Sequence, residues 1–86
     1  MNTSISPPPV KTDEVLETDH FSAYDDSGLR YCVIERMRVT RVRRGDEFIR
    51  MTPGERWYQT TSGALVRKCT DAEFEICNTG ARLRRN

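Results

Sequence analysis

Residues 29–42 read "LRYCVIERMRVTRV", and this stretch decides the fold class. It is rich in β-branched and aromatic residues, which favour strands. Its apolar side chains do not collect on a single stripe at helical spacing, so a helix is disfavoured. They change parity between Val39 and Val42, which indicates a bulge or a bend within one long strand.

Turn signals recur at short intervals after this strand. "RRGDE" at residues 43–47 predicts a tight hairpin, and "TPGE" at residues 52–55 fits a type II turn. The same kind of signal recurs further along, which leaves room for short strands over residues 48–52, 57–61, 64–69 and 74–78. The sequence therefore predicts a mostly β fold: a small antiparallel meander of about five strands, forming a sheet or an SH3-like or OB-like barrel, with an extended N-terminal tail.

The register of the last strands depends on their turns. Two-residue turns at residues 62–63 and 71–72 place Arg67 among apolar side chains, which argues against this register. A helix is the alternative after Thr70, because "TDAE" at residues 70–73 fits a capping box, but the apolar spacing favours a strand. The core face in this register consists of Tyr58, Leu65, Cys69, Phe74 and Ile76.

Charge divides the chain into two parts. Residues 1–27 carry one basic and six acidic side chains, a net charge of −5. The rest of the chain carries 13 basic and seven acidic side chains, a net charge of +6. We therefore expect residues 1–20 to be a flexible, acidic, proline-containing tail on a small β domain at residues 21–86, with Phe21 and Tyr24 docked on that domain.

Several classes of function are disfavoured. There is no run of about 18 apolar residues and no secretory signal pattern at the start, so we expect a cytoplasmic protein that does not span a membrane. The three cysteines have no CxxC spacing, and the single histidine, His20, lies far from Cys69 and Cys77, so no metal site is expected. The sequence leaves undecided whether Cys69 and Cys77 form a disulfide, because that depends on their geometry. The absence of a phosphate loop, a nucleophile elbow and a paired catalytic histidine predicts a non-enzymatic protein without a cofactor.

The abundance of arginine is the remaining indication of a function, since arginine accounts for 12 of the 14 basic residues. Arginine presents a planar fork of donors to phosphate or carboxylate groups and stacks on bases. A hairpin that turns at Gly45–Asp46 puts Arg41 opposite Arg50, a repulsion that an anionic partner would relieve. An ordinary solvated face of mixed charge is the alternative. The candidate nucleic-acid-binding residues are Arg36, Arg38, Arg41, Arg43, Arg44, Arg50, Trp57, Tyr58, Lys68, Arg82, Arg84 and Arg85.

Two functions follow as hypotheses. The first is a non-enzymatic nucleic-acid-binding module whose arginine-rich sheet face contacts phosphates, while the acidic tail competes for that face. The second is a small protein-interaction module, an adaptor or an inhibitor encoded by a mobile element, that acts through a sheet edge or the tail. The expected partner is thus nucleic acid or an acidic protein surface. Nothing in the sequence indicates the oligomeric state.

Overall fold

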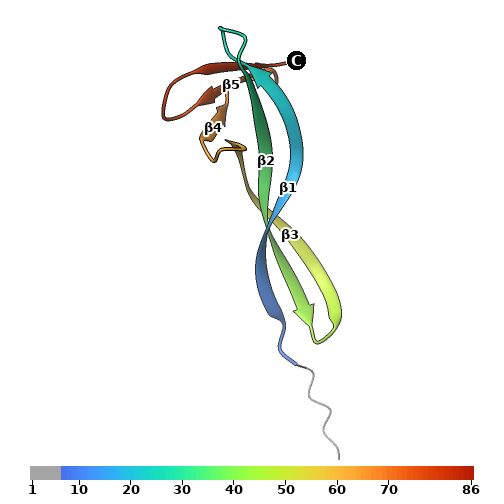
Figure 1. Cartoon of the computed structure of the whole chain (residues 1–86). Helices are drawn as coiled ribbons and strands as arrows, with labels where there is room; N and C mark the ends of the chain where they lie inside the picture. Colours follow the sequence, from blue (N-terminus) through green and yellow to red (C-terminus); the bar gives the residue numbers. More distant parts are fainter. Residues whose placement is uncertain (1–6) are drawn as a thin grey trace, which may run out of the picture.

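The computed structural model describes residues 7–86, and every regular element within that range is a β-strand (Figure 1). Each strand pairs antiparallel with the next, and the first also pairs with the last, so the sheet closes into a barrel. The predicted mostly β meander is confirmed, with six strands rather than about five. They are β1 (Val10–Tyr24), β2 (Arg30–Arg44), β3 (Glu47–Thr60), β4 (Leu65–Lys68), β5 (Glu73–Ile76) and β6 (Arg82–Arg85).

The three long strands extend well beyond the barrel. β4 pairs only with Tyr58 and Gln59 of β3, and β6 pairs only with Ala23 and Tyr24 of β1, so the barrel closes around one end of the sheet. The remainder of β1, β2 and β3 projects as a twisted three-stranded ribbon, and the molecule measures 74 × 22 × 20 Å (Figure 1). We call this ribbon the arm; it consists of residues 10–17, 36–44 and 47–57.

The barrel core draws side chains from every strand. Aromatic rings lie at its centre, with centroids 5.0 Å apart for Phe21 and Phe74 and 5.3 Å apart for Tyr58 and Phe74. Such tilted and edge-on arrangements suit the ring quadrupoles. Aliphatic side chains fill the space around the rings. The buried cluster is Phe21, Ala23, Val33, Val66, Phe74, Ile76 and Leu83.

The register of β4 differs from the prediction by one residue. The Thr60 N–H donates to the Ala64 carbonyl at 2.9 Å, so three residues form the loop, with Gly63 at a φ of 95° that only glycine adopts easily. This slip exchanges the two faces of β4. Val66 is therefore the core residue, at 4% exposure, while Leu65 is 54% exposed.

A second one-residue shift, between β4 and β5, corrects the rest of the predicted core face. Lys68 rather than Cys69 pairs with Phe74, and Cys69 is exposed. Arg67 points outward and lies 3.1 Å from Glu75, which removes the objection that the sequence raised. Residues 73–76 form a strand, as predicted in preference to a helix.

Bulges replace the turn predicted at residues 52–55. β3 runs through Pro53 and Gly54, and the register with β2 shifts there because β3 has an extra residue opposite Arg38. Glycine suits this close approach, since a Cβ on Gly54 would lie a tight 3.1 Å from the Arg38 carbonyl oxygen. A second bulge at Ile49 puts Arg41 opposite Met51 and Arg50 opposite Val42, so the expected Arg41–Arg50 repulsion does not arise.

The expectation of a flexible tail up to residue 20 is wrong for the residues from Val10 onward. They form β1, which pairs with β2 from Val10 to Tyr24. The acids of this segment are satisfied in the sheet: Asp13 accepts a hydrogen bond from the Thr40 hydroxyl at 3.0 Å, and Glu14 pairs with Arg41. Phe21 is buried and Tyr24 half-buried, as predicted. Residues 1–6 of the predicted tail lie outside the described residues, so a flexible tail stays a prediction only there.

Cys32, Cys69 and Cys77 are free thiols, so the disulfide left open by the sequence is not formed. Residues 7–86 contain no group of three or more His, Cys, Asp or Glu side chains placed to hold a metal ion. Over the same range, no helix has the length and apolar character needed to cross a bilayer.

Candidate nucleic-acid interface

The pairing register divides the arm's side chains between two faces. Successive side chains of a strand point to opposite faces, and directly paired residues share a face. The even-numbered residues of β2 in the arm therefore share a face with their partners on β1 and β3, and this face continues the outer surface of the barrel. It collects most of the arm's cations. We call the set Lys11, Arg36, Arg38, Arg44, Arg50 and Trp57 the basic face.

The cations of the basic face form no ion pairs within the described residues. None of the five lies within 4.0 Å of an acid among residues 7–86. Arg38 instead lies over the half-buried Trp57 ring, with its guanidinium carbon 5.8 Å from the ring centroid. The Trp57 ring is held in place because its Nε1–H donates to Gln59 at 3.2 Å. The arrangement leaves the guanidinium donors available to an anionic ligand.

Four acids share the basic face by register. One is Glu55, which lies in the bulge of β3 opposite Arg38, next to an arginine that shares the other face with Met37. Asp13 is opposite Thr40, Glu17 is opposite Arg36, and Glu47 is opposite Arg44. One carboxylate oxygen of Asp13 accepts a hydrogen bond from the Thr40 hydroxyl. Five cations against four acids leave this face with a net charge of +1.

The opposite face of the arm is partly apolar. Arg41 is bound by Glu14 there, so it is less available to a ligand. Arg43 is flanked in the sheet by Val10 and Phe48, which are 58% and 49% exposed. The predicted arginines of residues 36–44 are thus split between two faces, and only Arg36, Arg38 and Arg44 belong to the basic face.

The predicted cations of the barrel are held by acids. Arg84 lies 3.8 Å from Glu73, and Arg85 lies 3.3 Å from Asp19. The Arg85 guanidinium also lies 4.0 Å from the centroid of the Phe21 ring, which makes it part of the barrel wall. The other ion pairs on the barrel are Lys68–Asp71, Arg82–Glu73, Arg82–Glu75 and Arg67–Glu75.

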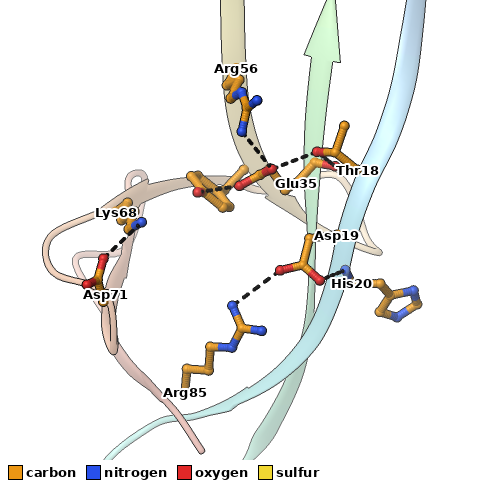
Figure 2. A network of polar contacts seen from close by, with 9 residues as sticks. Thr18, Asp19, His20, Glu35, Arg56, Lys68, Asp71 and Arg85 are labelled. Atoms are coloured by element: carbon orange, nitrogen blue, oxygen red, sulfur yellow. Dashed lines mark hydrogen bonds and ion pairs between the residues drawn. The ribbon is translucent and has the colours of Figure 1, made fainter.

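Glu35, Thr18 and Arg56 form a polar network where the arm meets the barrel (Figure 2), and Tyr58 is part of it. Its ring contributes to the core, and its hydroxyl donates to Glu35 at 2.6 Å. Burial and this hydrogen bond raise the pKa of Tyr58 to about 12. The hydroxyls of Tyr58 and Thr18 both donate to Glu35 and lower the pKa of that carboxyl. Tyr58 therefore does not share a surface with Trp57, and we leave it out of the basic face.

Lys11 belongs to the basic face, although the sequence predicts it in the tail. It pairs with Val42, across from Arg50. The β-branched residues Val10, Thr12 and Val15 around it were the available signal for a strand.

Comparisons of the chain with protein-family models, with curated proteins and with solved structures found no match.

Proposed function

We propose that the arm binds nucleic acid through its basic face. One observation carries the proposal: five cations lie on one face of a projecting ribbon, without an acid at ion-pair distance among the described residues. Arginine and lysine on such a surface contact phosphate oxygens, and these contacts position a protein without reading sequence. Trp57 offers an aromatic surface for base stacking where a strand is unpaired. The protein acts without an enzymatic step.

The acids of the same region limit the affinity. A net charge of only +1 on the face gives weak binding at physiological salt, with a steep dependence on ionic strength. The acidic segment, which the sequence suggested as a competing tail, acts here as the strand β1. Its Glu14 occupies Arg41 on the opposite face, while its Asp13 and Glu17 lie among the cations of the basic face.

The test is titration of labelled single- and double-stranded oligonucleotides at several salt concentrations. The slope of log K against log salt is expected to approach about −4.5 on duplex DNA if all five cations contact phosphates. Replacing two of them, in Arg44→Gln/Arg50→Gln, should weaken binding to every sequence and reduce the slope by about two.

The matched control is Arg82→Gln/Arg84→Gln, which removes the same charge from the barrel, where both arginines are held by acids. Its slope should stay close to that of the unmodified chain. Equal losses in the two double variants would mean that net charge alone attracts the oligonucleotide. Failure to bind any oligonucleotide at low salt would overturn the proposal.

A second candidate function is strand addition at the outer edge of β1. Within the described residues, β1 has a partner on that side only at Ala23 and Tyr24, so most of its edge is open. The edge of β3 is blunted by Pro53 and two bulges, as protected edges are. β1 carries Asp13, Glu14 and Glu17 on its arm segment, which suits an added strand rich in basic residues.

This candidate is tested with a peptide of alternating lysine and valine, by calorimetry. Binding should weaken in Glu17→Lys on β1 and stay unchanged in Glu47→Lys on β3. Equal effects of the two charge reversals would speak against an added strand at β1. Neither variant replaces a cation of the basic face, so a peptide that binds would not decide the nucleic-acid proposal.

A further inference from the structure

A histidine and a cysteine meet on the outer surface of the barrel. Nε2 of His20 on β1 lies 3.0 Å from Sγ of Cys32 on β2, within hydrogen-bond distance. The other ring nitrogen, Nδ1, lies 3.7 Å from a carboxylate oxygen of Glu17. A carboxylate, an imidazole and a thiol thus follow one another in the order that orients a base toward a sulfur nucleophile.

The bulge in β1 brings these groups together. Glu17 and His20 are three residues apart, so in a regular strand they would point to opposite faces. The register shifts between Glu17 and Asp19, and the extra residue, Thr18, returns His20 to the face of Glu17. Cys32 is paired with Ser22 and His20 with Ile34, so the thiol and the imidazole are diagonal neighbours across β1 and β2.

The surroundings leave the pair accessible. The His20 side chain is exposed and Cys32 is half-buried. Asp19 does not compete for the imidazole, because its carboxylate accepts the His20 backbone N–H at 2.8 Å and binds Arg85. Figure 2 shows the His20 ring pointing away from that carboxylate. The charged residues that share the outer face near the pair are Glu17 on β1 and Arg30 and Arg36 on β2.

We propose that Cys32 is a reactive thiol that forms mixed disulfides with low-molecular-weight disulfides, with His20 as its base. A histidine next to the sulfur distinguishes Cys32 from the other two cysteines. Cys69 and Cys77 are more exposed than Cys32, yet among residues 7–86 neither has a histidine at hydrogen-bond distance from its sulfur. The Cys69 thiol instead donates a 4.0 Å hydrogen bond to the Arg67 carbonyl oxygen. The inference is independent of the arm's proposed function.

The reaction is an exchange that needs no further reactant. The Cys32 thiol gives its proton to His20 Nε2 while its sulfur attacks one sulfur of the disulfide. The new S–S bond forms as the old one breaks, and the leaving thiolate takes the proton back from His20. The products are Cys32 as a mixed disulfide and one free thiol. Glu17 orients the ring so that Nε2 faces the sulfur.

The test measures modification site by site in the full chain. The reduced protein is incubated with glutathione disulfide near neutral pH, quenched with acid, and mapped by mass spectrometry over time. Exposure alone predicts that Cys69 and Cys77 react before Cys32, whereas the proposal predicts that Cys32 reacts first. In denaturant the three thiols should react at similar rates, because the advantage belongs to the folded arrangement.

Variants assign the effect to the histidine. His20→Ala should slow modification of Cys32 by on the order of 10²-fold, the contribution expected of a positioned base. The rates at Cys69 and Cys77 should not change. Ser22→Ala, a change directly opposite Cys32 that leaves the imidazole in place, should have no effect. The proposal is overturned if Cys32 reacts no faster than the other two thiols, or if His20→Ala retains the full rate while circular dichroism shows it folded.

Discussion

The Tyr58 hydroxyl donates a 2.6 Å hydrogen bond to Oε2 of Glu35 at the point where the arm leaves the barrel. The same carboxylate accepts a hydrogen bond from the Thr18 hydroxyl at 2.7 Å and lies 3.5 Å from Arg56 (Figure 2). Its side chain is only 14% exposed, so the ionised form depends on these donors. One carboxylate on β2 thus ties β1 and β3 together at the base of the arm.

The loss of this hydrogen bond should destabilise the fold. Tyr58→Phe leaves the half-buried carboxylate with one donor fewer, and we expect the free energy of unfolding to fall by roughly 1–3 kcal/mol. Urea denaturation near neutral pH measures the change. Tyr31→Phe is the matched control, because the Tyr31 hydroxyl is 3.4 Å from Asp25 and should contribute less than about 0.5 kcal/mol. Equal losses would contradict the role of Glu35 at the junction.

Tyr58 should make stability depend on alkaline pH. Its pKa is raised from 10.0 to about 12, first by burial and then by the hydrogen bond to Glu35. A group whose pKa is higher in the folded state stabilises the fold below the unfolded pKa, and this contribution disappears as the pH rises through the folded pKa. The urea midpoint of unfolding should therefore decrease as the pH rises from about 10 to about 12. Tyr58→Phe should abolish this alkaline decrease.

Glu35 should act in the opposite direction. The hydrogen bonds from Tyr58 and Thr18 lower its pKa below the ordinary value of 4.5. A depressed carboxyl pKa stabilises the fold above the unfolded value, and the contribution is lost as the pH falls through the folded value. Glu35→Gln should flatten the decline of the urea midpoint below pH 4.5. An unchanged acid limb in this variant would assign that decline to other carboxyls.

The register of β4 can be tested with two neighbouring residues. Val66 is 4% exposed and lies in the core cluster, so Val66→Ala should cost about 2 kcal/mol of unfolding free energy. Leu65→Ala removes a larger side chain that is 54% exposed, and it should cost less than about 0.5 kcal/mol. The reversed order, measured by urea denaturation, would restore the register with Leu65 in the core.

Truncation separates the arm from the barrel. Deletion of residues 1–16 removes the arm segment of β1 but keeps Phe21 and Ala23, so the barrel should retain its near-ultraviolet circular dichroism. The newly exposed edge of β2 should then lose protection against hydrogen exchange. Deletion of residues 1–24 also removes Phe21 and Ala23 from the core and should unfold the chain. A barrel that survives the longer deletion would contradict this division.

The sequence by itself determined the class of the fold and the start of its hairpins. Residues 30–44 form one long strand because β-branched residues recur without a helical stripe, and Gly45–Asp46 turns the chain as its signal indicates. These features depend on residues close together in the chain, where backbone preferences act directly. Arginine was also identified from composition as the residue type of the candidate interface.

The tertiary structure alone decided register, faces and partners. One extra residue in the loop before Leu65 and single-residue bulges at Thr18 and Ile49 determine which side chains point inward, and local patterns barely encode such slips. Pairing with β2 also made the acidic segment a strand. The same pairing placed Lys11 on the basic face and brought His20 next to Cys32. Arg85 forms its ion pair with Asp19, a residue far away in the sequence. Such contacts exist only once the strands are paired, because each joins residues that no short-range preference couples.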